Sequence, residues 1–242
     1  MTIPDRVTFE SIDPRWSIRI TDDGSPTLVD RATGDSMHSG CGAIAETNHV
    51  YLQNSGIRTG LESGKSCRVL EIGLGSGMAC LLTADLALRC KTVLDYVAIE
   101  NNLTPERLIL QLAFEKQGVA HEIVQSYCQC LRNSIGKASS AGAIGEYCKL
   151  TIDQSDASRW SNGDGEGFDA VYFDPYSPET NPTLWCDAVL KTMHHALVKG
   201  GRLVSYCVNR KVRDSLERVG FSVARVSGPI GGKREVLIAT AI

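Results

Sequence analysis

The segment Glu71-Ile72-Gly73-Leu74-Gly75-Ser76-Gly77 constrains the fold of this chain more than any other. The residues from Arg68 to Ile72 form a short apolar run that predicts a buried strand, and a helix is expected from about Ser76. Glycines at every second position allow a tight turn and a close approach of a ligand to the backbone, because no side chain intervenes. The dinucleotide fingerprint has a wider glycine spacing and its acid about twenty residues later. The segment therefore predicts either a different ligand-binding turn or an ordinary strand-to-helix connection.

Strands and helices alternate through the rest of the chain, which predicts a mostly parallel sheet with helices on both faces. Further strands are expected at 92–99, 150–153, 168–173, 202–207, 221–226 and 235–241. Helices are expected at 78–88, 104–117, 181–197 and 210–219. The last two strands are separated by a short glycine-rich segment, so they can form an antiparallel hairpin. The expected architecture is a seven-stranded α/β sheet that ends in this hairpin.

The first 56 residues are expected to form a side wall or lid, and residues 57–242 the main domain. Two short strand-like runs, 16–20 and 27–30, flank Asp22-Asp23-Gly24 and predict a small N-terminal hairpin. A helix-like segment, 42–52, follows before the glycine turn. One further region, 126–146, predicts a helix followed by a mobile loop near the site, because glycine, alanine and serine gather at its end.

The composition fits one globular domain, since the 242 residues are 43% hydrophobic and 22% charged. The nine cysteines include no C-x-x-C pair, which predicts reduced thiols that pack as small apolar residues. The spacing of Cys128, Cys130 and Cys148 is poor for zinc, so no metal site is expected. No signal segment and no apolar run of membrane-spanning length is present. A cytoplasmic protein without a membrane partner is expected.

The overall charge of −3 and pI of about 6.0 do not indicate nucleic-acid binding, but the charge is uneven. From Lys199 to the end, nine basic residues stand against three acidic ones. Such an excess is compatible with an anionic partner. It is equally compatible with a solvated face of helices and strand ends.

Acidic residues follow the expected second and third strands. Glu100 ends the strand 92–99, where a carboxylate can hold the two hydroxyls of a ribose, although a turn acid would also occur there. Asp156 lies in a polar turn after 150–153, in a position to accept from an adenine amino group. Because the carboxyl ends of parallel strands share one edge, both side chains are expected near the glycine turn.

The fourth strand, 168–173, ends in Asp174-Pro175-Tyr176, which should meet the glycine turn at the same edge. Asp174 can accept from an amine or orient it, Pro175 fixes the local backbone, and Tyr176 can stack on a base or donate through its hydroxyl. The alternatives are a helix-capping or turn acid and an aromatic ring that only packs.

The chain resembles a known family in several segments. Glu71 to Gly77 resembles motif I of S-adenosylmethionine-dependent methyltransferases. The runs 43–52, 173–185, 213–220 and 232–235 resemble the methyltransferase domain of the bifunctional enzyme that makes 5-methylaminomethyl-2-thiouridine in tRNA, the MnmC type. Two departures lie near the expected substrate: Pro175-Tyr176 replaces glycine-phenylalanine, and Ala45-Glu46 replaces paired glutamates.

The resemblance implies a Rossmann-like class I methyltransferase fold with S-adenosylmethionine as cofactor. It also implies N-methylation of the aminomethyl group of wobble uridine. The implied cofactor-binding residues are Glu71, Gly73, Gly75, Gly77, Glu100, Asp156 and Asp174. The resemblance places Asp174 at the transferred methyl group, and Asp174 and Tyr176 are the expected catalytic residues. The implied substrate or tRNA contacts are Glu46, Tyr51, Pro175, Lys233 and Arg234.

The resemblance further implies tRNA as partner. The flavin oxidase domain that accompanies this domain in the bifunctional enzyme is absent from the sequence. A stand-alone form would therefore methylate an amine made elsewhere, by a separate FAD-dependent oxidase or by the upstream uridine-modifying complex.

Three alternatives remain at this stage. Asp174-Pro175-Tyr176 is reminiscent of adenine or glutamine amino-methyltransferases, although one proline is missing. A spermidine-synthase-like aminopropyltransferase would share the sheet, but it would need more carboxylates, and the basic C-terminal part argues against a polyamine. A binding module without activity is disfavoured by the intact acids Glu71, Glu100 and Asp174.

Overall fold

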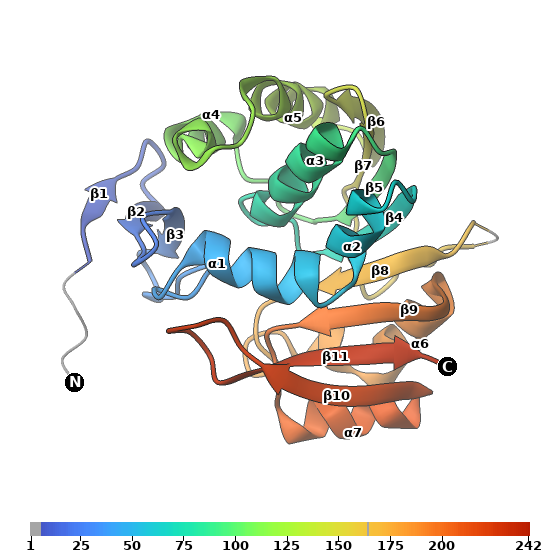
Figure 1. Ribbon diagram of the computed structural model, residues 1–242. Coiled ribbons are helices and arrows are strands. Elements are labelled where there is room, and N and C mark those ends of the chain that lie inside the picture. The colour runs from blue at the N-terminus through green and yellow to red at the C-terminus, as the bar shows by residue number, and fades with distance from the viewer. Residues whose placement is uncertain (1–5, 164) are drawn as a thin grey trace.

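The central sheet has eight strands in the order β10-β11-β9-β8-β4-β5-β7-β6. The computed structural model describes residues 6–163 and 165–242 (Figure 1). The strands of the sheet are β4 (Cys67–Ile72), β5 (Leu94–Ile99), β6 (Ser139–Ile144), β7 (Cys148–Asp153), β8 (Phe168–Phe173), β9 (Leu197–Ser205), β10 (Phe221–Ser227) and β11 (Glu235–Ala241).

The five central strands, from β9 to β7, run parallel, and both edges of the sheet are antiparallel. β4 pairs with β8 on one side and β5 on the other, so the strand order reverses at β4. At one edge β10 pairs antiparallel with β11, as the sequence predicted. A crevice outside the carboxyl ends of the strands is the usual ligand site where strand order reverses.

Both faces of the sheet are covered by helices because its central strands bury side chains on both sides. Val69 packs with one cluster of buried residues and Leu70 with the other. The first cluster includes α3 (Met78–Cys90), α4 (Glu106–Gln111) and α5 (His121–Ser134). The second includes α6 (Asp187–Ala196) and α7 (Arg210–Arg218). Figure 1 shows α3 and α5 on the side of the sheet opposite to α7.

A three-stranded antiparallel sheet lies beside this core, with β1 (Thr8–Glu10), β2 (Trp16–Ile20) and β3 (Pro26–Asp30). The predicted hairpin of β2 and β3 is confirmed, whereas β1 was not predicted. The chain then forms α1 (Ala43–Thr47), the π-helix η1 (Asn48–Gln53) and α2 (Ile57–Glu62). Trp16 and Leu28 join the first buried cluster, so this small sheet is anchored to the main core.

The expected helix 104–117 is wrong as one continuous element. α4 ends at Gln111, and a 3-10 turn, η2 (Phe114–Gln117), follows. Ala113 between them adopts a left-handed conformation with φ of 50°, which interrupts the helical backbone. Thr104 does not cap α4, because its hydroxyl donates to the carbonyl oxygen of Gly75 at 2.6 Å.

The expected helix 181–197 is likewise divided, into η3 (Pro182–Trp185) and α6. Cys186 between them is extended, with ψ of 157°. Trp185 packs edge-on against Phe173, with ring centroids 5.0 Å apart. Burial of this indole therefore holds the short η3 turn against the end of β8 before α6 begins.

The mobile loop expected within 126–146 is instead an ordered edge strand, and the sheet therefore has eight strands rather than seven. β6 pairs antiparallel with β7 over its whole length. A Cβ atom on Gly142 would lie 2.6 Å from the Cys130 sulfur of α5, so a small residue is needed there. The small side chains that suggested a loop thus permit close packing of an edge strand on a helix.

All nine cysteines are free thiols. Within residues 6–163 and 165–242, no helix combines the length and apolar character needed to cross a membrane. In the same ranges, no group of three His, Cys, Asp or Glu side chains is placed to hold a metal ion.

Candidate active site

A cavity of about 760 Å³ lies at the carboxyl ends of β4, β5 and β8. Its floor is formed by the glycine turn after β4 and by the residues that follow β5 and β8. Its wall includes residues 36–39 and side chains of α1 and η1. Segments far apart in the sequence therefore converge on one site, as the parallel topology requires.

The turn after β4 lies directly against the turn after β8. Gly73 has φ of 88°, and a Cβ atom there would lie 2.8 Å from the carbonyl oxygen of Asp174. Gly75 has φ of 53°, and its Cβ position is open apart from the Met37 sulfur at 3.6 Å. Glycine is thus needed at 73 for the approach of the two turns, while 75 leaves room for a ligand.

Ser76 offers an unpaired polar group in this turn. Its side chain is only 3% exposed and lines the cavity. Its hydroxyl oxygen has no hydrogen-bond partner among residues 6–163 and 165–242. Buried hydroxyls normally have partners, so this atom fits a ligand that supplies one.

Gly77, which was predicted to contact the cofactor, lies outside the cavity lining. Its φ is 74°, and a Cβ atom there would overlap the ring and hydroxyl of Tyr127. The third glycine of the motif therefore serves the start of α3 and its packing on α5.

Glu71 lies beneath the turn with 2% of its surface exposed. One carboxylate oxygen accepts a hydrogen bond from the Tyr96 hydroxyl at 2.8 Å. Burial raises the pKa of Glu71 well above its usual value, and the Tyr96 donor opposes this in part. No ion pair in the described residues neutralises this carboxyl group, so a cationic ligand in the cavity would suit it.

Glu100 joins the end of β5 to the glycine turn. Its two carboxylate oxygens accept from the backbone N–H groups of Gly75, at 3.3 Å, and Asn102, at 2.9 Å. Burial raises the pKa of Glu100, and these backbone donors oppose the shift. Asp156 is exposed at the cavity rim and accepts from the Ser158 N–H at 2.9 Å, which lowers the pKa of Asp156. Both acids thus accept hydrogen bonds from the backbone of turns at the cavity, and both line the cavity itself.

Asp174 lines the cavity directly after β8, and its backbone lies against the glycine turn at Gly73. Its pKa is raised to about 8, chiefly by burial; the Tyr51 hydroxyl and Lys233 lower it, and the charge of Glu46 raises it. A carboxylate with a pKa near neutrality can accept a proton far more readily than an ordinary aspartate.

Glu46 and Lys233 line the same cavity as Asp174. Glu46 of α1 is 7% exposed, and its Oε2 accepts from the Ser39 N–H at 2.6 Å. The Lys233 ammonium lies over the Tyr206 ring, 4.0 Å from its centroid. The Tyr206 hydroxyl in turn donates to the carbonyl oxygen of Pro175 at 3.0 Å. Acidic, basic and aromatic groups are therefore held together around Asp174.

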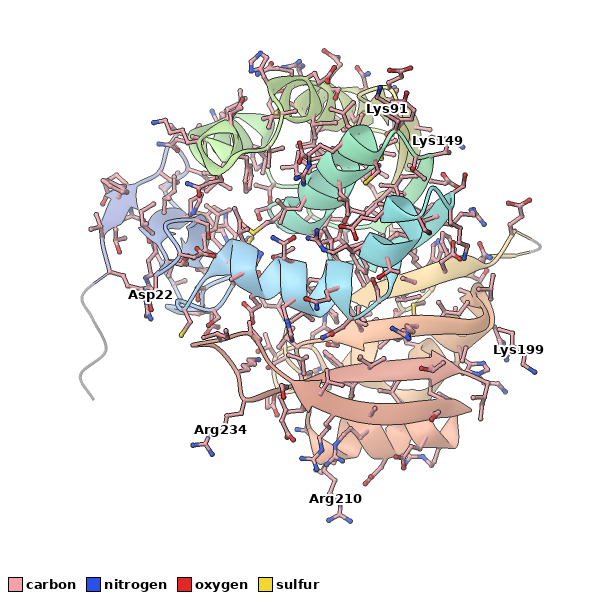
Figure 2. All side chains as sticks on the ribbon, in the orientation of Figure 1. Asp22, Lys91, Lys149, Lys199, Arg210 and Arg234 are labelled. Atoms are coloured by element: carbon pink, nitrogen blue, oxygen red, sulfur yellow. The ribbon has the colours of Figure 1, made fainter. Side chains whose placement is uncertain are left out.

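Tyr176 lies at the rim with half of its surface exposed. Its backbone carbonyl accepts from the Trp185 indole N–H at 2.8 Å, so the backbone is fixed while the ring faces solvent. Arg234 does not line this cavity but an adjoining smaller one, together with Lys233. Figure 2 shows the Arg234 side chain projecting from the molecule.

The C-terminal positive charge is more dispersed than the sequence suggested. Arg218 and Arg225 form ion pairs with Asp187 and Glu235. In Figure 2 Lys199 lies far from Arg210 and Arg234. Only some of the basic residues of the C-terminal part therefore lie beside the cavity, where they could meet an anionic partner.

The cavity also includes residues that the sequence did not single out, namely Ser39, Ser76 and Tyr206. Tyr206 directly follows β9, so the rule that ligands meet carboxyl ends of strands could have identified it. Ser39 lies in a turn-rich segment whose sequence carries no comparable signal.

The sheet order, the C-terminal hairpin and the glycine turn beside acidic strand ends define a class I methyltransferase fold. A family model described as S-adenosyl-L-methionine-dependent methyltransferase matches residues 118–242, more than half of the chain. The chain belongs to this family, and its dependence on S-adenosylmethionine follows. The expected fold class, cofactor and enzyme class are thereby confirmed.

Similar proteins indicate which methyltransferases of this family the chain resembles. The tRNA 5-methylaminomethyl-2-thiouridine biosynthesis bifunctional protein MnmC of Ralstonia nicotianae is 28% identical over 209 residues, covering 85% of this chain and 31% of that protein. The protein of the same name from Paracidovorax citrulli is 30% identical over 214 residues, with 85% and 32% covered. The chain thus spans about a third of the curated relatives that it matches.

A solved structure agrees with this grouping. MnmC2 from Aquifex aeolicus superposes with a TM-score of 0.73 at 25% identity, covering 96% of this chain and 72% of that one. The resemblance to MnmC-type methyltransferase domains that was found in the sequence is therefore confirmed.

Proposed function

We propose that this protein N-methylates the aminomethyl group of wobble uridine in tRNA, converting 5-aminomethyl-2-thiouridine into 5-methylaminomethyl-2-thiouridine. The observation that carries the proposal is the position of Asp174 and Glu46, two carboxyl groups that line the same cavity as the glycine turn. This pair suits a cationic amine beside a methyl donor. The names of the similar MnmC proteins support the same substrate.

The cofactor fits the end of the cavity that contains the glycine turn. We assign its amino-acid part to Glu71, Gly73, Gly75 and Ser76, its ribose to Glu100 and its adenine to Asp156. The unpaired Ser76 hydroxyl and the open Cβ position of Gly75 support this assignment. When bound, S-adenosylmethionine supplies an electrophilic methyl group on a sulfonium centre.

Asp174 prepares the amine for attack. An alkylamine with a pKa of about 10.4 is mostly protonated near neutral pH, so it must lose a proton before its lone pair can react. The ionised form of Asp174, whose pKa is raised to about 8, takes this proton and orients the nitrogen, and the charge of the ammonium group favours that ionised form. The Tyr51 hydroxyl, which acts on Asp174, holds the carboxyl group in position.

The rim of the cavity binds the nucleoside and its RNA. Tyr176 stacks on the uracil or a neighbouring base, because its exposed ring stands on a backbone fixed by Trp185. Pro175 supports this turn through the hydrogen bond from Tyr206. Lys233 and Arg234 contact phosphate groups near the anticodon. Residues 36–51 form the wall of the cavity beside the bound amine. A separate enzyme supplies the aminomethyl group of the substrate.

The decisive comparison is between two transfer reactions. The full chain is incubated with methyl-labelled S-adenosylmethionine and tRNA that carries 5-aminomethyl-uridine, and in parallel with decarboxylated cofactor and a diamine. Label in the tRNA with no aminopropyl product supports the proposal. An aminopropyl product without labelled tRNA would refute it and favour the aminopropyltransferase alternative.

A further inference from the structure

Glu46 is a buried acid that lines the cavity. The residue belongs to α1 and is 7% exposed. Its Oε2 is bonded to the Ser39 N–H, whereas no hydrogen bond in the described parts of the chain involves Oε1. Glu46 lines the cavity, so this oxygen can meet a ligand there. A buried acid in a cavity is a candidate for a ligand contact or a catalytic task.

Glu46 and Asp174 belong to separate elements but face one cavity. Asp174 follows β8, and Glu46 approaches from α1 across the site. They interact electrostatically, and both also interact with the Lys233 ammonium. A small cation between the two carboxyl groups would satisfy both.

The π-helix η1 explains how Tyr51 comes to face the same space. Residues 46 and 51 would be separated by about 140° around an ideal α-helix. The chain after Thr47 instead has wider turns, with the Asn54 N–H bonded to the carbonyl of His49 at 3.2 Å. Both Glu46 and Tyr51 line the cavity as a result. Such π-helical segments often occur at functional sites.

We propose that Glu46 is a specificity residue that acts with Asp174 to limit the reaction to one methyl group per amine. This inference rests on the function proposed above. A neutral primary amine has two N–H groups and one lone pair. When each carboxyl group accepts one N–H, the lone pair is left pointing in the remaining direction, toward the methyl donor.

The balance of bonds explains why transfer stops after one step. The carbon–sulfur bond breaks, a carbon–nitrogen bond forms, and the nitrogen becomes a secondary ammonium that again has two N–H groups for the two acids. For a second transfer, the secondary ammonium group must lose one proton, and the lone pair of its nitrogen must again point toward the methyl donor. The first methyl group would then stand against one of the two carboxyl groups, which would lose its hydrogen bond.

Two substitutions separate this role from a structural one. Glu46→Ala removes one acceptor and opens space for a methyl group, so we expect the ratio of dimethylated to monomethylated nucleoside to rise about tenfold or more. Glu46→Gln can keep the Ser39 bond while presenting an amide N–H to the cavity. Its single transfer should slow about tenfold, with no dimethylated product because the amide fills the space.

The experiment uses the full chain, excess S-adenosylmethionine and tRNA that carries 5-aminomethyl-uridine, with mass analysis of the released nucleosides. Glu122→Ala, an exposed position on α5 outside the cavity, is the matched control and should behave as the unmodified protein. Monomethylated product alone from Glu46→Ala, or an unchanged rate for Glu46→Gln, would overturn the inference and leave the proposed function intact. Absence of transfer by the unmodified protein would overturn the proposed function itself.

Discussion

Asp174, the proposed proton acceptor, lies in an electrostatic environment that surface aspartates lack. It follows the strand next to β4, faces the cavity and has its pKa raised to about 8. The sequence could place Asp174, Glu71 and Glu100 at one edge because each follows a parallel strand. It could not show that Gly77 lies outside the cavity, because that depends on the Tyr127 ring from α5.

Asp174→Asn should lower turnover by about 10²–10⁴-fold, because an amide cannot take the proton of the amine. The affinity for S-adenosylmethionine should change little, since the glycine turn and Glu100 are untouched. Single-turnover kinetics and calorimetric titration measure the two effects. Asp214→Asn, an exposed position on α7, is the control. Equal turnover in Asp174→Asn and Asp214→Asn would remove Asp174 from the reaction.

The raised pKa of Asp174 also makes stability depend on pH. The ordinary pKa of 3.8 applies to the unfolded chain and a pKa of about 8 to the folded protein, so the folded state binds this proton more tightly between those values. Its contribution to stability is complete below the lower pKa and is lost as the pH rises through about 8. Asp174→Asn removes this loss.

We therefore expect the melting temperature of Asp174→Asn to exceed that of the unmodified protein by a margin that grows between about pH 5 and about pH 9. Each kcal/mol corresponds to about 2–4 °C in a chain of this size. Calorimetry without cofactor measures the margin. A margin that stays constant with pH would show that the pKa of Asp174 is not raised in the folded protein.

The regular elements follow closely from sequence pattern where packing alone determines them. The strand 168–173 and the C-terminal hairpin were predicted because apolar residues run through one and a glycine-rich turn joins the other. The interruption of the expected helix 104–117 was not predicted, because the left-handed break occurs at Ala113, a residue that usually favours helix. Strand β6 was not predicted either, because its small residues are typical of a loop. Their role in close packing against α5 is visible only in the folded structure.

Gly77 allows a direct test of how α3 is joined to the glycine turn. Gly77→Ala adds backbone strain at φ of 74° and a clash with Tyr127. Gly136→Ala adds similar strain at φ of 73°, with nothing within 4 Å of its Cβ position. Strain alone costs about 1–3 kcal/mol, and the clash should add about 1–3 kcal/mol of free energy of unfolding. Denaturant titrations that show equal losses for the two variants would contradict the described packing.

The molecule as a whole presents its positive charge unevenly around the cavity. Lys233 lines the cavity and Arg234 the space beside it, whereas Lys199 lies on a distant part of the molecule (Figure 2). The sequence predicted a basic C-terminal part but not this separation, since ion pairs such as Arg218 with Asp187 depend on the folded arrangement.

Lys233→Ala and Arg234→Ala should each weaken tRNA binding and reduce the slope of log affinity against log salt by about 0.7–0.9, the value for one lost phosphate contact. Lys199→Ala is the matched control and should leave the slope unchanged. Filter-binding titrations at several salt concentrations give these slopes. If all three variants behave alike, the phosphate contacts lie elsewhere.

Nucleoside mapping of the methylated tRNA tests the proposed reaction on the whole molecule. The tRNA carrying 5-aminomethyl-2-thiouridine is treated with labelled S-adenosylmethionine and the unmodified protein, with Asp174→Asn as control, then digested to nucleosides and analysed by mass. We predict one labelled methyl group on the side-chain nitrogen of the wobble nucleoside, and almost none with Asp174→Asn. Label on any other nucleoside, or an unlabelled wobble position, would contradict the proposed function.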